Sequence, residues 1–326
     1  ATVCLAARVV GLDIAGIDLV ASDISRPLEE QGGAIVEVNA GPGLLMHLKP
    51  EHGKPRPVGQ AIADHLFKAN DNGRIPIVGV IGTQSTTQLS HLIAWLVHLN
   101  GAHTGLACGD GLFINEAKIR SGDATHFDEA QTLLINRNIE AAVIETRAIH
   151  ILSDGLPYDR CRLGVVTDGC TIDGLESHDI KTPEQLRNVV RTQVDVILSD
   201  GAAVLNADDA KVVELADLCD GEVIFYSPDA DNPVLVAHRQ KGRRTVSIID
   251  NEVVLIRGDQ VTVLFNLGMA AIARLINQEK VNLPTLLAAC ASAWALDISP
   301  ALIRAGLKNF GQPPLRVANQ LARVNA

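Results

Sequence analysis

Residues 75–97 read IPIVGVIGTQSTTQLSHLIAWLV, and this stretch decides the fold. An apolar run typical of a buried strand ends at Gly82-Thr83, and a helical apolar pattern begins at Thr86. A strand that turns through glycine into a helix has the architecture of a phosphate-binding loop, whose first helical amides face the phosphates. Such loops place glycine and lysine before the helix, where this chain has Ser85 and Thr86. The stretch predicts the architecture of the loop and leaves its chemistry in question.

The apolar patterns on either side of this stretch predict an α/β protein. From residue 75 onward strands alternate with helices, which is typical of βαβ units around a mostly parallel sheet. Four short apolar runs within 233–265 indicate an antiparallel meander at one edge. The predicted strands are 75–81, 140–145, 162–167, 202–205 and 222–226, and the predicted helices are 86–99, 127–137, 182–197, 209–219, 267–278, 283–295 and 299–308.

The composition indicates a well-buried protein and disfavours several classes. The 326 residues are 47% apolar but only 3% aromatic, as expected for aliphatic parallel strands. A formal net charge of −10 disfavours nucleic acid as a partner. No apolar run in the sequence approaches the roughly 20 residues that cross a membrane. The six cysteines show no paired spacing, which predicts buried thiols in a reducing compartment, and we expect a cytoplasmic protein.

The segment before the loop carries a second candidate site. Two strands are predicted at 16–21 and 33–38, and prolines after them predict a linker. Asp18 lies on the first strand, while Glu37 and Asn39 lie two residues apart on the second and therefore share one face. If the strands pair, two carboxylates and an amide oxygen meet, which is a donor set that Mg²⁺ accepts. Solvated carboxylates at strand ends are the alternative interpretation.

These strands carry a family resemblance. The runs GLDIAGIDLV, residues 11–20, and GGAIVEVNAGPG, residues 32–43, resemble the end of the ATP-grasp domain of the cyanophycin synthetase family. The resemblance implies that three residues bind the magnesium ions of ATP: the acid of the first strand, Asp18, and the acid and amide of the second, Glu37 and Asn39. It also implies the reaction, in which a carboxylate becomes an acyl phosphate that an amine then attacks. It implies that residues 1–68 are the C-terminal part of that domain with a linker. The chain is then expected to begin within the domain, with the N-terminal part of the same enzyme as its partner.

Residues 69–326 resemble the Mur-ligase-like domain that follows in this family. The resemblance implies a P-loop-like domain of the central Mur type, with a mostly parallel sheet and an antiparallel edge meander, lacking the C-terminal Rossmann-like domain that closes Mur ligase sites. The nucleotide-site positions that match are Gly82 and Thr83 of the loop, the magnesium-binding hydroxyl of Thr87, Glu145 at a strand end, and Asn206 near the adenine.

Other positions depart from the family pattern. Thr86 replaces the loop lysine, whose charge would stabilise the transferred phosphate by on the order of several kcal/mol. The strand-end motif that should contain histidine begins Asp168-Gly169-Cys170, and the metal-binding carbamylated lysine of the next helix aligns with Val190. We therefore expect a catalytically degenerate domain that acts as a scaffold for folding and for a homo-oligomer.

The resemblance is greatest to the shorter type of cyanophycin synthetase, which polymerises β-aspartyl-arginine dipeptides. It implies an ATP- and Mg²⁺-dependent carbon–nitrogen ligase whose partners are the cyanophycin chain and the dipeptide, with this chain alone expected to be inactive. Two alternatives stay open. One is a Mur-type ligase that remains active with its atypical loop and adds arginine to the aspartate backbone. The other is a nucleotide- or polymer-binding pseudo-enzyme.

Two further features are ambiguous. His91, Trp95 and His98 form one stripe of the helix after the loop, so they either contact a ligand or pack partly buried against the sheet, and amphipathic packing is favoured. The basic run 239–244 predicts a hairpin turn whose charges are solvated or contact an acidic polymer.

Overall fold

The computed structural model describes residues 2–67, 73–277, 279 and 281–312. The chain divides into two compact units between Arg74 and Ile75. The predicted boundary at 68/69 lies outside the described residues. In the described part of the chain, no helix combines the length and the apolar character needed to cross a membrane.

The first unit buries little of its apolar surface. It contains the helices α1 (Thr2–Val10), η1 (Glu29–Gln31), α2 (Leu45–Leu48) and α3 (Val58–Leu66) and the antiparallel strands β1 (Gly16–Val20) and β2 (Ala34–Asn39). None of its described residues is buried, and large apolar side chains such as Val9, Ile24 and Met46 are mostly exposed. A two-stranded sheet of this kind is marginally stable in water by itself. The unit therefore exposes much of its own apolar surface.

The second unit is built on an eleven-stranded sheet with the order β13-β12-β11-β10-β9-β8-β3-β7-β4-β5-β6. In this spatial order, each neighbouring pair between β11 and β4 is parallel. At the two edges, β12 and β13 on one side and β5 and β6 on the other pair in antiparallel fashion. The central strands are β3 (Ile77–Ile81), β7 (Ala141–Thr146), β8 (Cys161–Val166), β9 (Ile197–Asn206) and β10 (Glu222–Asp229). All of β3 is buried, which explains its unbroken aliphatic sequence.

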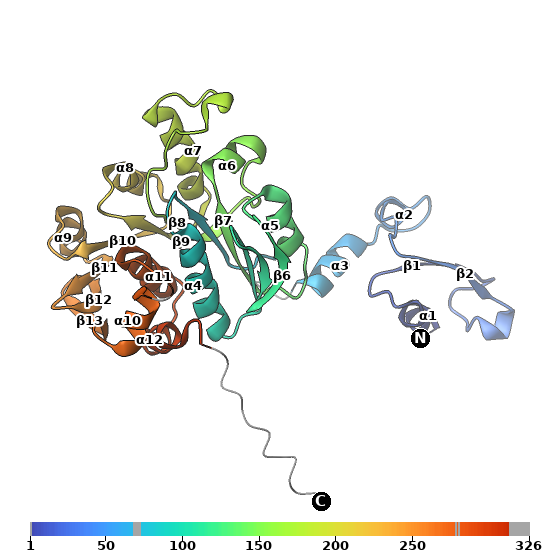
Figure 1. The fold of residues 1–326 in the computed structure, drawn as a ribbon. Helices are drawn as coiled ribbons and strands as arrows, with labels where there is room; N and C mark the ends of the chain where they lie inside the picture. The colour runs from blue at the N-terminus through green and yellow to red at the C-terminus, as the bar shows by residue number, and fades with distance from the viewer. Residues whose placement is uncertain (1, 68–72, 278, 280, 313–326) are drawn as a thin grey trace, which may run out of the picture. The chain divides into compact units, whose positions relative to one another are not determined.

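Helices cover both faces of this sheet (Figure 1). One core contains buried residues of α4 (Thr86–Leu99), α10 (Ala270–Asn277), α11 (Leu283–Ala295) and α12 (Pro300–Asn309). The other contains buried residues of α5 (Phe127–Leu134), α6 (Ala148–Asp154), α7 (Pro183–Asp195), α8 (Ala210–Val213) and α9 (Pro233–Gln240). Val78 and Val80 of β3 belong to the first core and Ile77 and Ile81 to the second, as strand alternation requires. The predicted α/β fold with a mostly parallel sheet is confirmed.

The prediction of an edge strand is wrong for the first segment of the meander. Residues 233–240 form helix α9, because the Asn232 side chain accepts a hydrogen bond from Val234 N, Pro233 opens the first turn, and the buried Leu235 and His238 lie three residues apart. The remaining segments form the expected antiparallel strands β11 (Arg244–Ile249), β12 (Glu252–Arg257) and β13 (Gln260–Asn266). The basic run 239–244 consequently spans the last two residues of α9, the connection after it and the first residue of β11, and does not form a hairpin turn.

The opposite edge was not predicted. It consists of β4 (Thr104–Cys108), β5 (Gly111–Ile114) and β6 (Ala117–Ser121), which are short and are joined by two-residue connections. Helix α6 was also missed, and the single helix predicted at 209–219 is divided into α8 and the 3₁₀ turn η3 (Ala216–Leu218). Elements of four or five residues carry too few positions for a period to be recognised. The end of the predicted helix 267–278 lies outside the described residues.

Asn282 provides a test of how the α11 layer is anchored. Its Oδ1 accepts a hydrogen bond of 2.8 Å from Thr285 N at the start of α11, and its Nδ2 donates to Ser85 Oγ in the loop at 3.1 Å. Asn282→Ala is expected to lower the free energy of unfolding by about 1 kcal/mol, because it removes a helix cap. Urea unfolding followed by tryptophan fluorescence reports on this unit, since Trp95 and Trp294 both lie in it. Asn282→Asp keeps an acceptor and should lose less stability, so equal losses in the two variants would contradict the capping role.

Candidate functional site

Strand β3 delivers the loop to the edge of the sheet at which the parallel strands end. Ile81 lies opposite Thr146 of β7 and Val166 of β8, and Val166 in turn lies opposite Leu205 of β9. The residues that follow these strand ends therefore meet the loop, as in other open α/β sheets where ligand sites form at this edge.

The loop backbone keeps a left-handed residue at Ser85, although serine stands there in place of glycine. Ser85 has φ 57° and ψ 14°, the left-handed conformation that favours glycine, and it occupies the position of the family's second loop glycine. Gly82 remains necessary, because a methyl group there would overlap Thr167 Oγ1. The backbone conformation of the loop is therefore kept at both positions. At Ser85 this requires a residue with a side chain to adopt the unfavourable left-handed conformation.

Glu145 is the buried acid of the site, with 2% of its surface exposed. Its carboxylate accepts hydrogen bonds from Thr86 Oγ1 at 2.8 Å, from Thr87 Oγ1 at 2.9 Å, and from Gly109 N at 2.8 Å. The residue in the lysine position thus donates a hydrogen bond to Glu145 through its hydroxyl. These three donors come from two segments and satisfy a buried carboxylate that would otherwise be costly.

Asp168 places a second carboxylate against the loop. It accepts hydrogen bonds from Thr83 N at 2.8 Å, from Cys170 N at 2.9 Å, and from Thr167 Oγ1 at 3.1 Å. Backbone N–H groups of such loops form the nest that holds a phosphate. In this chain the Thr83 N–H of that nest donates to an acidic side chain of the protein itself. The sequence showed that the family's histidine is absent here but gave no signal that Asp168 reaches the loop.

A cavity of about 470 Å³ lies beside these groups. Its charged lining residues are Glu145, Arg147 and Asp173, and Arg147 is paired with Asp123 at 2.9 Å. The cavity therefore carries more acidic than basic side chains, an unfavourable environment for a phosphate chain without a metal ion.

Asn206 and Val190 have structural contacts. Asn206 Nδ2 donates to Thr167 O at 2.9 Å, and its Oδ1 accepts from Asp208 N at 3.0 Å, so the side chain fixes the end of β9. Val190 is 1% exposed and belongs to the core under α7. The position expected for a carbamylated lysine is therefore part of the apolar packing.

The second candidate site lies on the first unit. Asp18 of β1 lies directly opposite Glu37 of β2, and a register shift beside Asp18 leaves Val36 as the extra residue. Asn39 Nδ2 donates to Glu37 Oε1 at 2.6 Å. The predicted pairing of these strands is confirmed, and it brings the carboxylate positions together. The described residues contain no group of three or more acidic, histidine or cysteine side chains arranged for a metal ion, and this set has two acids and an amide.

The fold of the second unit resembles that of a solved structure. Over 74% of this chain and 47% of the other, the fold matches a solved structure of UDP-N-acetylmuramoyl-L-alanyl-D-glutamate–2,6-diaminopimelate ligase with a TM-score of 0.53 and 16% identity. The second unit thus has the Mur-ligase-like α/β fold, with a large, mostly parallel sheet and an antiparallel edge. The sequence of a ligase of the same name from Chlamydia felis is 31% identical over 140 residues, 41% of this chain and 28% of that protein. No family model matches the chain.

The more extensive similarity is to cyanophycin synthetase. The chain is 38% identical over 311 residues to that of Synechocystis sp., covering 93% of this chain and 35% of the relative, and 35% identical over 303 residues to that of Trichormus variabilis, covering 93% and 33%. The chain is therefore a homologue of cyanophycin synthetase over nearly all of its length and spans about a third of the length of these relatives.

Asp168→Asn tests whether the carboxylate holds the loop. One oxygen that accepts backbone N–H groups would become an amino group, so we expect about 1–3 kcal/mol lower unfolding free energy by urea titration of tryptophan fluorescence. Asp173→Asn is the matched control, because Asp173 is an exposed residue that lines the same cavity. If both variants lose the same small amount, Asp168 does not support the loop.

Proposed function

We propose that this chain is part of an ATP-dependent ligase of cyanophycin biosynthesis in which the β1–β2 unit contributes magnesium ligands of an ATP-grasp site. Asp18, Glu37 and Asn39 would bind the ions that accompany ATP. When bound, these ions neutralise phosphate charge while a chain carboxylate is activated for attack by the amine of a β-aspartyl-arginine unit. The Mur-like unit would be a catalytically inactive scaffold for folding and for a homo-oligomer.

The observation that carries this proposal is the opposition of Asp18 and Glu37. Like charges directly opposite each other on paired strands are unfavourable, and both side chains are exposed. A divalent cation between them removes that repulsion, and carboxylate and amide oxygens suit Mg²⁺. Asn39, which donates to Glu37, orients the carboxylate and leaves its own Oδ1 available as a further oxygen ligand. The donor set fits the ion.

The loop contacts support the scaffold part of the proposal. The Thr83 N–H donates to Asp168, and the hydroxyls of Thr86 and Thr87 donate to Glu145. A phosphate at this place would have to displace two carboxylates of its own charge sign without the lysine that normally attracts it. Mur-type ligation at the loop, the rival enzyme hypothesis, needs those same donors.

The homology and the fold support an ATP-dependent ligase. The uncovered apolar side chains of the first unit, including Val9, Ile24 and Met46, fit a segment that packs against further protein. We propose that this further protein is the remaining part of the ATP-grasp domain.

A polymerisation assay on the complete protein that contains these residues tests the proposal. The assay supplies ATP, Mg²⁺ and a cyanophycin primer, with either the β-aspartyl-arginine dipeptide or free aspartate and arginine, and measures chain growth. Growth is expected with the dipeptide only. Glu37→Gln is expected to reduce the rate at least about 100-fold, since it removes a charged ligand of the ion that stabilises the transition state.

The matched control is Glu145→Gln, the same change at the loop. It should leave the rate within about twofold once the protein is confirmed to be folded. Chain growth from free aspartate and arginine that is lost in Glu145→Gln would instead establish an active Mur-type site and contradict the proposal.

A further inference from the structure

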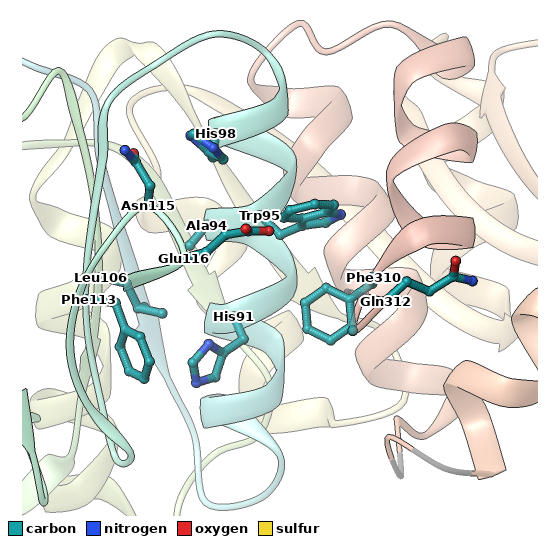
Figure 2. Close-up of a pocket in the computed structure, with 11 residues that line it drawn as sticks. His91, Ala94, Trp95, His98, Leu106, Phe113, Asn115, Glu116, Phe310 and Gln312 are labelled. Carbon is teal, nitrogen blue, oxygen red and sulfur yellow. The ribbon is translucent and has the colours of Figure 1, made fainter. Parts of the chain in front are cut away.

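A second cavity, of about 360 Å³, lies along helix α4 (Figure 2). It is formed by one face of α4, by β4 and β5 with the turn after β5, and by the residues that follow α12. The stripe of His91, Trp95 and His98 predicted from the sequence lines it, and all three side chains are half-buried. The stripe therefore packs only in part and also borders open space.

Aromatic rings from three separate elements form the walls. Trp95 comes from α4, Phe113 from β5, and Phe310 from the end of α12. Trp95 Nε1 donates to Gly306 O at 2.9 Å, and the ring lies edge-on to Phe310 with centroids 6.4 Å apart. The polar edge of the indole is thus already bonded to the protein, and its ring is held in a fixed orientation.

The charge of the cavity is negative. Glu116, in the turn after β5, is its acidic residue, and neither lysine nor arginine occurs among the described residues that line it. Figure 2 shows the Glu116 side chain extending from this turn toward Trp95. Burial lowers the pKa of His91, so that its ring is neutral near pH 7. The carboxylate thus faces aromatic rings without a fixed positive charge in the cavity wall.

A cation already contacts one of these rings. Lys118 Nζ lies 5.1 Å from the centre of Phe113, although Lys118 is not one of the lining residues. The neighbouring thiol does not suggest covalent chemistry. Cys108 Sγ lies 3.6 Å from His91 Nε2, but burial raises the pKa of this thiol to about 12, which keeps it protonated and unreactive. The chemistry left to the cavity is binding.

We propose that this cavity binds the guanidinium group of an arginine side chain. A guanidinium is planar and weakly hydrated, so it stacks on aromatic faces and at the same time donates two hydrogen bonds to a carboxylate. A compact ammonium offers neither property to the same extent. The volume is within the range of small-molecule sites. If the proposed function holds, the natural bearer is an arginine-containing polymer, and the Mur-like unit retains this polymer.

The test is calorimetric titration of the 326-residue chain, without ATP, with N-acetyl-arginine amide. N-acetyl-citrulline amide is the neutral isostere, and N-acetyl-lysine amide carries an ammonium. The arginine amide is expected to bind at least about tenfold more tightly than either, and to shift the indole N–H resonance of Trp95 but not that of Trp294. Equal binding of the citrulline amide, preferred binding of the lysine amide, or no binding of the arginine amide would each overturn the proposal.

Charge variants sharpen the result. Glu116→Gln is expected to weaken binding of the arginine amide about three- to tenfold, and Lys118→Met to strengthen it by removing a like charge. Glu176→Gln, an exposed acid on η2 (Glu176–His178), is the matched control and should bind as the unchanged chain does. Urea unfolding verifies that each variant is folded. Because ligation is not measured, failure of this site and failure of the proposed function are separate outcomes.

Discussion

The carboxylate of Glu145 is the constraint on which the arrangement of the second unit depends. Glu145 is the second-to-last residue of a fully buried strand, β7, beside the strand that leads into the loop. Because a buried charge must be satisfied, the start of α4 and the turn after β4 are both tied to it through Thr86, Thr87 and Gly109. Helix α4 then forms the floor on which α11 and α12 pack and one wall of the cavity around Trp95. The same contacts that order the fold occupy the donors that a nucleotide would need.

Much of this fold was predictable because its signals are long. The aliphatic strand 77–81 and the fourteen-residue helix that follows have unambiguous periods, and the buried strands after 141 alternate with amphipathic helices. The edges were not predictable to the same degree. Strand β5 has four residues, and 233–240 is apolar enough to resemble a strand although its proline and asparagine cap make it a helix. In such short segments tertiary packing decides the structure.

The candidate sites show the same division. Strand alternation, which is a local rule, placed Glu37 and Asn39 on one face. Asp18 was expected to face them only if the two strands paired, and the structure shows this pairing. The contact of Asp168 with Thr83 joins residues 85 positions apart, and no local pattern encodes it. The cavity around Trp95 likewise combines α4 with residues after α12, which only the fold brings together. The sequence therefore shows which loop residues have been replaced. It does not show which distant side chains, such as Asp168, form hydrogen bonds with the loop.

We propose that the loop of the Mur-like unit does not accept a nucleotide because Asp168 and Glu145 occupy its donors. Equilibrium titration of the chain with MgATP, followed through the backbone amide resonance of Thr83, measures this directly. We expect the Thr83 resonance to stay unchanged at ATP concentrations that saturate active phosphate loops. A saturable shift of this resonance that disappears in Thr87→Ala would show that the loop still binds ATP, and would contradict the account.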